Sequence, residues 1–587
     1  MSNRNKYHNY DLHPTKEIKG YDGEAWNSRD SILKELCRAV NEKQKGAVRD
    51  SIVVVFDLYP GVRKQEILDL AKELHPTRIL DVEECRKSEE QRTDEFYDYI
   101  TDDRVFGIIC HKKLEDLYQK EKLEKLRRDL DKEKGLTVLV GMGAGLVTEG
   151  DIYIYCDITR WEIQLRYRAG MANWNCTNEN APILTKYKIG FFVEWRLADR
   201  YKKERFQRFS YILETEEEHN PKMITGNAFQ KGLECFAREP FRLEPYYDPG
   251  VWGGHWMQEH FDVGQEKENL AWSFDGVPEE NAINMKFQDV TVKLPAMDLI
   301  LLHPHEVLGE RVHGRYGAEF PIRFDMLDTM GGGNLSLQVH PLTEYIQDSF
   351  GMHYTQDESY YLLDTDEEQE TFVYLGLKEN VDREQMAEDM KRAEKGEIPF
   401  PAEKYVNKIP VKKHDHVLIP AGTVHCSGKD TMVLEISATP YIFTFKMWDW
   451  DRVGLDGLPR PIHVEHGLKN IQWDRTTQWV YDNLIHQEKE MENREGCLIE
   501  KTGLHDREPI DTYRYTLTEP VTVECDDSVN VGNLVDGKEA RIESVDGSFE
   551  PFAVHYAETF IVPAGVDKYV IRPVEGEVKV IVASIRR

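Results

Sequence analysis

Apolar residues follow two different rhythms along the chain. Over the first 235 residues, short apolar runs such as SIVVVFDL (51–58) and LTVLVG (136–141) precede segments such as RKQEILDLAKEL (63–74). Short apolar runs bounded by turns are typical of buried strands, and apolar residues three or four apart are typical of amphipathic helices. The alternation predicts an α/β domain over residues 1–235 with a largely parallel sheet and helices on its faces.

Three further segments complete this first prediction. VFGIICH (105–111) and DIYIYCDI (151–158) have the apolar content of buried strands, and TRWEIQLRYRAG (159–170) has the pattern of a helix. We therefore expect two more strands in the sheet and a helix after the last of them.

From about residue 236 the pattern changes to short apolar runs broken by glycine and proline. Such runs predict the antiparallel strands of a sandwich or barrel, and they continue through the tail from about residue 500. Helical periodicity interrupts them at 382–397 and again near 294–309.

An internal repeat divides this β region. VLIPAGTVH (417–425) recurs as FIVPAGVDK (560–568), and an apolar alternating strand follows each copy. Two related β modules, 236–490 and 491–587, explain the repeat. The position of His425 in the first copy is taken by Lys568 in the second, so any metal site built on this histidine is lost there.

Composition narrows the classes of protein and of partner. Nine scattered cysteines without a CxxC motif indicate reduced thiols, and the polar start lacks the apolar stretch of a signal peptide, so we expect a cytoplasmic protein. The sequence contains no run of about 18 apolar residues, so it predicts no membrane-spanning helix. The formal charge of -31 opposes nucleic acid and anionic membrane as partners, and an anionic small substrate would need a local basic pocket.

The first candidate chemistry lies in LSLQVHPLTEY (335–345). Side chains alternate along a strand, so Gln338 and His340 point to the same side. If that side faces the core, both polar groups must be satisfied, and one metal ion would satisfy both. The alternative is an edge strand on which the two residues face solvent.

Two later residues extend the set. DESYYLLD brings Glu358 onto a following strand, and the IPAG turn delivers His425 from a later one. Two imidazoles, a carboxylate and an amide oxygen suit a divalent transition metal with room for a further oxygen ligand. His303 and His305 also alternate, but we expect them on the surface near a helix.

The β region resembles a known enzyme family. LSLQVHP, ESYYLLD, LIPAGTVH, LEI and WDWDRVGLDGLPRPIHV occur in the order seen in class I mannose-6-phosphate isomerases, which are zinc-dependent cupins. The resemblance covers roughly residues 240–585 and implies a double cupin barrel with a helical insert. It also implies one zinc ion per chain, with Gln338, His340, Glu358 and His425 as its ligands.

The same resemblance implies a reaction. Glu435, in the LEI strand, would be an active-site carboxylate for proton transfer between C1 and C2 of mannose 6-phosphate or fructose 6-phosphate. The alternative for Glu435 is a structural strand glutamate paired with a lysine. Metal binding and turnover are separate expectations, because the ligands match the family better than the other residues of the site do.

The departures concern positive charge. Where the family usually has lysine, lysine and arginine, this chain has Asp325, Gln356 and Lys446. Lysine keeps a point charge but loses the bidentate geometry of arginine toward phosphate. Lys446 is therefore a catalytic candidate, and Arg452 and Arg460 are the nearest phosphate-binding candidates. The alternative for all three cations is a solvated surface position.

VVVFDLYPGVRKQE (53–66) has the pattern of a strand, turn and helix, and DIYIYCDITRWEIQLRYRAG (151–170) that of a strand running into an arginine-bearing helix. In these segments the amino-terminal region resembles a P-loop kinase of the uridine or nucleoside type. A working phosphate loop has the pattern GxxxxGK[ST], but Gly61 is followed within three residues by Lys64, and no serine or threonine follows that lysine. GMGAG (141–145) leads into a strand, so it is not a dinucleotide fingerprint. We interpret the domain as a degenerate kinase fold; Arg160, Arg166 and Arg168 either hold an anion or are solvated.

The sequence thus predicts a degenerate P-loop α/β domain fused to a metal-binding β region that isomerises a hexose 6-phosphate. The rival from another class is a sugar-phosphate binding or regulatory module that keeps the metal and lacks turnover. A third possibility, a kinase in the first domain that feeds the second, lacks the loop hydroxyl that positions Mg²⁺.

Overall fold

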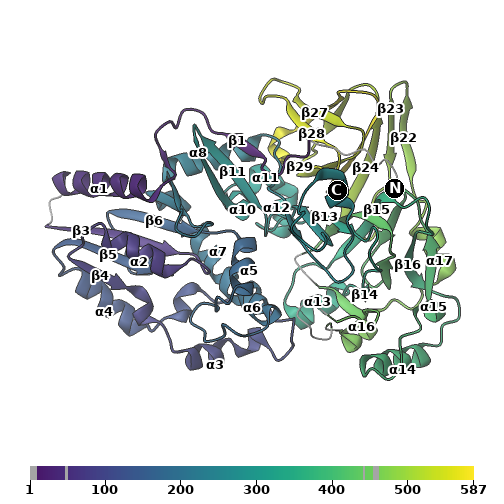
Figure 1. Ribbon diagram of the computed structural model, residues 1–587, viewed down its shortest axis with the longest axis horizontal. Helices are drawn as coiled ribbons and strands as arrows, with labels where there is room; N and C mark the ends of the chain where they lie inside the picture. The colour runs from purple at the N-terminus through teal and green to yellow at the C-terminus, as the bar shows by residue number, and fades with distance from the viewer. Residues whose placement is uncertain (1–8, 47–49, 440–442, 454–459, 461) are drawn as a thin grey trace. The chain divides into compact units, whose positions relative to one another are not determined.

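The computed structural model describes residues 9–46, 50–439, 443–453, 460 and 462–587 (Figure 1). The chain forms two compact units, each built from segments that are distant in sequence. Unit 1 comprises Met1–Pro14, Arg238–Pro278 and Pro304–Arg587, and unit 2 comprises Thr15–Ala237 and Glu279–His303. Among the described residues, no helix combines the length and apolar character that a membrane crossing requires.

One segment lies in a different unit from its neighbours in sequence. Residues 279–303 contain the hairpin β11 (Ala282–Phe287) and β12 (Val290–Pro295) and the helix α10 (Ala296–Leu302). β11 pairs in parallel with β1 (Thr15–Glu17), which ties the segment to the start of unit 2. The expected boundaries near residues 235 and 490 remain predictions, but the segment 279–303 does not join the β region in which we placed it.

Unit 2 is built on a seven-stranded sheet with the order β2-β8-β7-β6-β3-β5-β4. β4, β5, β3, β6 and β7 pair in parallel, β8 pairs antiparallel with β7, and β2 pairs antiparallel with β8 at the edge. The strands are β2 (Ala25–Trp26), β3 (Ser51–Leu58), β4 (Arg78–Asp81), β5 (Gly135–Gly141), β6 (Ile152–Asp157), β7 (Tyr211–Glu214) and β8 (Lys222–Thr225). The largely parallel sheet and three of its four expected strands are therefore present.

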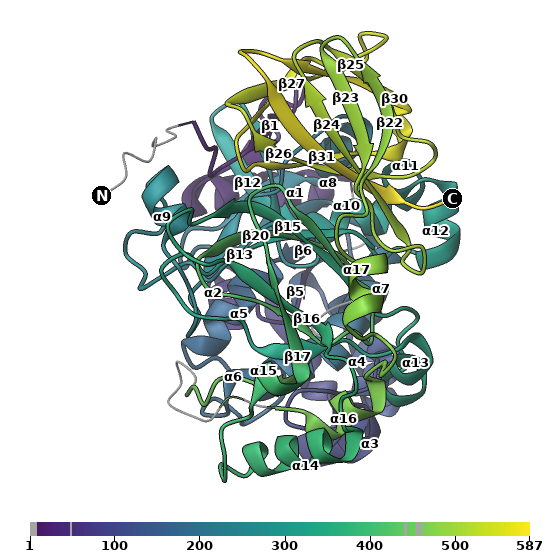
Figure 2. The ribbon, with the colours of Figure 1, turned by 90° about the vertical axis from the view of Figure 1, so that its right-hand side faces the viewer.

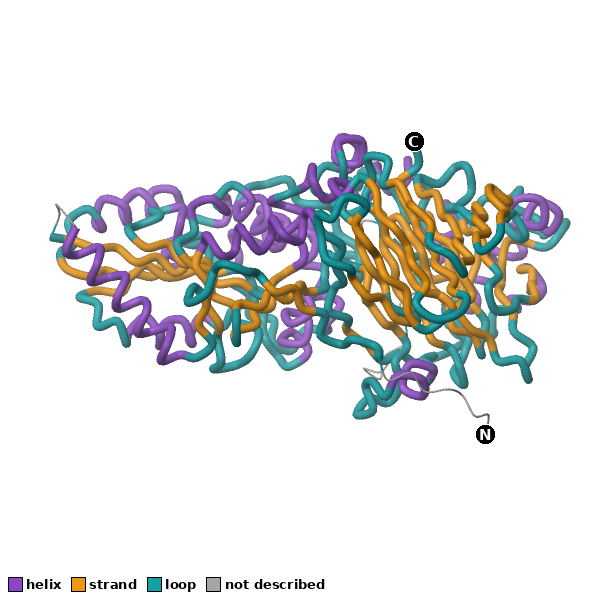
Figure 3. The backbone as a smooth tube through the Cα atoms, turned by 90° about the horizontal axis from the view of Figure 1, so that it is seen from above, coloured by secondary structure: helices purple, strands orange, loops and turns teal. Residues whose placement is uncertain are grey.

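Helices flank this sheet, as Figure 3 shows from above. Val54 and Phe56 of β3 share a buried apolar cluster with Leu36 of α1 and Leu70 of α2, since alternate strand residues point to the same face. The helices of unit 2 besides α10 are α1 (Arg29–Gly46), α2 (Lys64–Lys72), α3 (Glu89–Ile100), α4 (Lys120–Leu130), α5 (Arg160–Arg168), α6 (Ile183–Ile189), α7 (Trp195–Lys203) and α8 (Gly226–Arg238).

The strand predicted at 105–111 is wrong. The backbone N–H of Ile108 donates to the carbonyl of Tyr99 at 2.7 Å, and the N–H of Cys110 donates to that of Phe192 at 2.9 Å. A Cβ on Gly107 would lie 2.5 Å from the Tyr99 carbonyl oxygen. The apolar run is a buried loop whose backbone groups are satisfied by helical segments, which strand periodicity alone does not distinguish from a buried strand.

The first part of unit 1 consists of two antiparallel sheets. Their orders are β18-β15-β20-β13-β10-β9 and β17-β16-β19-β14-β21, and Figure 2 shows β20 between β15 and β13. The strands are β9 (Tyr246–Asp248), β10 (Trp272–Gly276), β13 (Arg323–Asp328), β14 (Leu337–Val339), β15 (Asp357–Thr365), β16 (Phe372–Leu377), β17 (Val406–Pro410), β18 (His416–Ile419), β19 (His425–Ser427), β20 (Thr431–Ala438) and β21 (Phe445–Trp448).

Short helices connect these strands, and the predicted helical insert is present as α14. Its N-cap Asp382 accepts a hydrogen bond from the backbone N–H of Gln385 at 3.1 Å, which satisfies one free donor of the first turn. The helices of unit 1 are α9 (Trp256–Phe261), α11 (Pro304–Leu308), α12 (Glu310–Tyr316), α13 (Thr343–Phe350), α14 (Arg383–Glu394), α15 (Ala402–Tyr405), α16 (Val464–Asn470) and α17 (Thr477–Asn483).

The rest of unit 1 is a second pair of antiparallel sheets, β22-β23-β24-β31-β26-β29 and β25-β30-β27-β28. Strands of both sheets contribute to one apolar cluster that contains Phe560, Tyr569 and Val580. The strands are β22 (Lys489–Arg494), β23 (Cys497–Lys501), β24 (Ile510–Leu517), β25 (Val521–Glu524), β26 (Asn530–Asp536), β27 (Glu539–Ser544), β28 (Phe552–His555), β29 (Thr559–Val562), β30 (Lys568–Pro573) and β31 (Val578–Ile585). The two sheet pairs match the expected β texture, and the double cupin barrel remains a prediction.

Candidate metal centre

The four predicted ligands come together between the first two sheets of unit 1. Gln338 lies on β14, opposite His425 at the start of β19, and His340 directly follows β14. Glu358 comes from β15 in the other sheet. All four side chains are buried, and His340, Glu358 and His425 are each 0% exposed. The solvent-facing alternative for Gln338 and His340 is therefore wrong.

Glu358 occupies the centre of the group. Its two carboxylate oxygens lie 3.0 Å from Nε2 of His340 and 2.7 Å from Nε2 of His425. The side-chain amide of Gln338 contacts Nε2 of His425 at 3.3 Å through its nitrogen, and turning the amide over would present its oxygen there instead. The ligand atoms of the two histidines and the glutamate all lie within 4.8 Å of one another.

Both imidazoles are oriented by backbone carbonyls. Nδ1 of His340 contacts the carbonyl oxygen of Phe443 at 3.1 Å, and Nδ1 of His425 contacts that of Thr423 at 2.8 Å. A carbonyl only accepts, so each Nδ1 carries a proton, and Nε2 is the ring atom that faces the Glu358 carboxylate. Among the described residues, Nε2 of His340 and Oε1 of Glu358 lack any hydrogen-bond partner. These buried acceptors facing one another fit a metal ion.

The electrostatics of the group lead to the same conclusion. Burial raises the pKa of Glu358, but His340 and His425 outweigh burial and hold this pKa well below its usual range. Burial lowers the pKa of His340, but the Glu358 carboxylate outweighs it and raises that pKa. Without a metal, the cluster therefore stabilises a proton on an imidazole, and a divalent cation can replace that proton.

Glu435 lies beside the ligands on β20. It is 8% exposed, and its register partners are Asp325 on β13 and Tyr360 on β15. The side-chain nitrogen of Gln356 donates to Glu358 at 2.8 Å and approaches Glu435 at 3.4 Å. Burial and the charges of Asp325 and Glu358 raise the pKa of Glu435 well above its usual range. The expected alternative partner, a lysine, does not occupy these positions.

Two arginines pair with one carboxylate that directly follows the strand carrying Lys446. Lys446 on β21 is the register partner of Gln338. Asp449 is 4% exposed and pairs with Arg452 at 2.5 Å and with Arg460 at 2.7 Å. Burial, together with the positive charge of Arg460, lowers the pKa of Lys446 to about 7. The cations are thus partly buried and not fully solvated.

Sequence reasoning missed two parts of this centre. Asp449, which binds both arginines, stands in the WDWDR motif, where an acid between cations was an available signal. The backbone acceptors at Phe443 and Thr423 leave no signal in the sequence. Residues 454–459 and 461 of the same motif lie outside the described residues.

The repeated motif does not form a second centre of this kind. Lys568, the counterpart of His425, is 47% exposed and pairs with Glu524 at 2.8 Å. His305 is exposed beside Glu310, as expected, whereas His303 is half-buried.

In unit 2, the turn that resembles a phosphate loop is short. Gly61 has a φ of +95°, and a Cβ there would lie 2.7 Å from Ile163, so the turn requires glycine. Lys64 begins α2, and its ammonium pairs with Asp81 at 2.6 Å and with Glu83 at 2.7 Å. The lysine is thus already neutralised by carboxylates.

The glycine-rich GMGAG segment also already holds an anion. The carboxylate of Asp57, at the end of β3, accepts hydrogen bonds from the backbone N–H groups of Gly143, Ala144 and Gly145 at 2.8, 3.1 and 3.0 Å. Successive N–H groups of this kind form an anion-binding concavity. The chain's own carboxylate fills it.

The candidate arginines of α5 have partners within the protein. Arg160 pairs with Asp199, and Arg166 pairs with Glu162 at 2.9 Å and donates to backbone carbonyls. The guanidinium of Arg168 lies 5.1 Å from the centre of a neighbouring tryptophan ring. Arg160 and Arg166 are buried, so neither expected role, a solvated arginine or an anion ligand, describes their contacts.

Comparison with known proteins finds one family profile and several distant relatives. A protein-family profile described as a domain of unknown function, DUF8485, matches residues 30–238. The mannose-6-phosphate isomerase of Streptococcus mutans is 27% identical over 234 residues, which are 39% of this chain and 67% of that protein. The mannose-6-phosphate isomerase ManA of Bacillus subtilis is 23% identical over 235 residues, 40% of this chain and 68% of that protein.

Among solved structures, the crystal structure of the mannose-6-phosphate isomerase from Bacillus subtilis aligns with 59% of this chain and 100% of its own. The TM-score is 0.49 at 19% sequence identity. In sequence, the chain is distantly similar to the two mannose-6-phosphate isomerases named above.

Proposed function

We propose that unit 1 is a metal-dependent aldose–ketose isomerase that interconverts mannose 6-phosphate and fructose 6-phosphate, with zinc as its metal. The observation that carries the proposal is the set of buried acceptors: two imidazoles whose Nε2 atoms both face the Glu358 carboxylate. Distant sequence similarity to enzymes of that name supports the choice of substrate.

In this proposal Gln338, His340, Glu358 and His425 hold the metal. When bound, the metal polarises the sugar oxygens and so makes the carbon-bound proton more acidic. Glu435 removes the proton from C2 of the aldose and returns it to C1 of the enediol, and the proton of the C2 hydroxyl passes to O1, so that the aldehyde becomes an alcohol and C2 becomes the ketone.

Lys446, Arg452 and Arg460 bind the substrate phosphate in this proposal. The whole chain has a formal charge of -31, so an anionic substrate needs a local cationic group to offset the repulsion. The two arginines share Asp449, which orients them and neutralises one of their charges.

A second candidate is a sugar-phosphate binding module that keeps the metal and lacks turnover. It is favoured by the pKa of Lys446, which burial lowers to about 7, and by Gln356, an uncharged residue that contacts both Glu358 and Glu435. A coupled assay for fructose 6-phosphate from mannose 6-phosphate, on metal-loaded protein, separates the two candidates. Turnover supports the isomerase; its absence, together with calorimetric binding of mannose 6-phosphate, supports the binding module.

A further inference from the structure

The parallel sheet of unit 2 has a point where its connections diverge. β3 and β6 are neighbours in the sheet. From β3 the chain continues to β4, toward one edge of the sheet, and from β6 it continues to β7, toward the opposite edge. In open α/β sheets, ligands bind in the crevice at the carboxyl ends of two such strands. Topology alone therefore marks the ends of β3 and β6 as a place for a ligand.

A cavity of about 490 Å³ lies at this place. Its lining includes the turn after β3 and the start of α2, residues 61–66, together with Met171 and Trp174 from the segment after α5. Glu218 and His219, from the connection between β7 and β8, also line it. The cavity thus combines an apolar wall with a charged rim.

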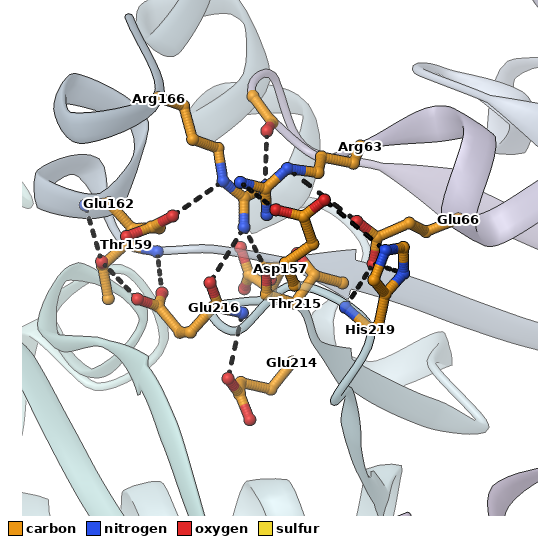
Figure 4. Close-up of polar contacts among 12 residues, drawn as sticks. Arg63, Glu66, Asp157, Thr159, Glu162, Arg166, Glu214, Thr215, Glu216 and His219 are labelled. Atoms are coloured by element: carbon orange, nitrogen blue, oxygen red, sulfur yellow. Dashed lines mark hydrogen bonds and ion pairs between the residues drawn. The ribbon is translucent and has the colours of Figure 1, made fainter. Parts of the chain in front are cut away.

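The charged rim contains a mixed set of metal-ligating atoms. Glu66, Glu218 and His219 offer ligand atoms that all lie within 4.8 Å of one another. The imidazole of His219 lies 3.8 Å from Glu66 through Nδ1 and 3.5 Å from Glu218 through Nε2. Figure 4 shows Glu66 and His219 directed toward each other beside Arg63.

Arg63 lies against both carboxylates without a close hydrogen bond to either. Its Nε is 3.8 Å from Oε1 of Glu66, and its Nη2 is 3.6 Å from Glu218. Oε1 of Glu66 is a buried oxygen that lacks a hydrogen-bond partner among the described residues. The other oxygen of Glu66, Oε2, accepts a hydrogen bond from the backbone N–H of His219 at 3.0 Å, and the side chains of Glu218 and His219 are 59% and 75% exposed. Arg63 thus compensates the two carboxylates only at long range, and a divalent cation bound directly to them would interact more strongly.

The surroundings favour a cation over a phosphate. Asp157, Glu214 and Glu216 gather at the carboxyl ends of β6 and β7, as Figure 4 shows. The cavity lining itself adds the carboxylate of Asp69 to those of Glu66 and Glu218. Arg166, the buried cation of this region, already donates to Glu162 and to the carbonyls of Gly61 and Thr215.

We propose that this cavity binds a divalent first-row transition metal through Glu66, Glu218 and His219, and that Arg63 competes with the metal as an internal cation. Two carboxylates and one imidazole form a borderline donor set that suits Mn²⁺, Fe²⁺ or Zn²⁺. Three protein ligands leave further positions for water or for an oxygen-bearing ligand in the cavity.

The test uses the full-length chain carrying His340→Ala and His425→Ala, which removes the centre in unit 1. Equilibrium dialysis with Mn²⁺ and with Zn²⁺ alone should then find about one ion per chain. Adding Glu66→Gln and His219→Ala should weaken binding at least about tenfold, since loss even of residues that only support a metal ligand costs about 10- to 100-fold. Glu217→Gln, a neighbouring glutamate that pairs instead with Lys222 at 3.9 Å, is the matched control and should change nothing.

Arg63→Gln gives a result of opposite sign. Removal of the competing guanidinium should tighten metal binding, which a merely damaged loop would not do. The proposal is overturned if the background variant binds neither metal, if Glu66→Gln with His219→Ala binds as before, or if Glu217→Gln weakens binding equally. Because the background lacks the unit 1 ligands, failure here leaves the proposed isomerase untouched, and failure of the isomerase leaves this test intact.

Discussion

Both units bury carboxylates, but they neutralise them in different ways. In unit 1, Glu358 faces two imidazoles whose exposed fraction is 0%. In unit 2, Asp157 and Asp298 are also almost fully buried, and the ammonium of Lys202 contacts both, at 2.5 Å for Asp157. One cluster needs a proton or a metal to be satisfied, whereas the other contains its own cation.

This difference in how the carboxylates are neutralised distinguishes the candidate metal centre of unit 1 from the structural ion cluster around Lys202 in unit 2. The ammonium of Lys202 is further enclosed by aromatic rings, 5.1 Å from the centre of Tyr59 and 5.4 Å from that of Tyr155. A permanent internal cation stabilises one arrangement, because removing it would leave buried charges unpaired. The acceptors of unit 1 can be occupied by an exchangeable ion, which chemistry at a metal requires. Five changes test this contrast, beginning with the largest effect.

The first change empties the centre of unit 1. His340→Ala with His425→Ala removes two of the four ligands, so the metal content should fall from about one ion per chain to none in that unit, and isomerase activity should disappear. Elemental analysis and the coupled assay measure both, with His305→Ala, an exposed histidine, as control. The proposed site in unit 2 would retain its own ion. The metal content with and without His340→Ala and His425→Ala is therefore compared in protein that also carries Glu66→Gln and His219→Ala. Unchanged occupancy there would refute the assignment of the ligands.

The second change removes the internal cation of unit 2. Lys202→Met should destabilise that unit by about 3–5 kcal/mol, since it removes the cation that the buried Asp157 and Asp298 share. Hydrogen exchange of the β6 amides measures the local loss, and the exposed neighbour Lys203→Met is the matched control. Adding Asp298→Asn should restore part of the stability. Equal protection in Lys202→Met and the control would show that the cluster contributes little.

The third change concerns the proposed acid–base residue. Glu435→Gln keeps the shape of the side chain but cannot move a proton, so turnover should fall by about 10² while metal content and substrate binding remain. The decisive readout is kcat against KM, because a purely structural role would alter both or neither. Wild-type turnover in the variant would exclude Glu435 as the base.

The fourth change alters the cation that faces Gln338 across the sheet. Lys446→Met should raise KM about tenfold if the ammonium binds the substrate phosphate, in line with a charged hydrogen bond. Lys446→Arg should retain or improve binding through a bidentate donor, and Gln356→Lys, which adds a cation beside Glu358, should raise activity. If neither the metal-loaded wild type nor the double variant Gln356→Lys, Lys446→Arg turns over hexose phosphate, the result supports the sugar-phosphate binding module instead of the isomerase.

The smallest effect concerns pH and unit 2. Burial raises the pKa of Glu214 to about 7, so the folded protein holds a proton that the unfolded chain releases near pH 4.5. Stability should therefore be greatest below pH 4.5 for this group and fall as the pH rises toward 7. Glu214→Gln should reduce this fall without removing it, because the pKa of Glu216 is raised to about 8 as well.

Thermal melts at pH 5 and pH 8 measure that slope. Glu217→Gln, which changes an exposed glutamate in the same connection, should leave it unaltered. A Glu214→Gln variant with the full wild-type slope would assign the pH dependence to other groups.

Local pattern determined much of the fold and most of the proposed centre. Short apolar runs marked β3, β5 and β6, and strand alternation placed Gln338 and His340 on one side. The IPAG turn pointed to His425. These features depend on neighbours in sequence, so periodicity and turn chemistry are sufficient to recognise them.

Tertiary structure decided what depends on residues far apart. The apolar run 105–111 became a loop because helical segments satisfy its backbone, and 279–303 joined unit 2 because β11 pairs with β1 and Asp298 meets Lys202. The carbonyls that fix the tautomers of the two ligand histidines also come from other segments. Burial and charge pairing bring such groups together through long-range packing, and no local periodicity records which distant partner each group will find.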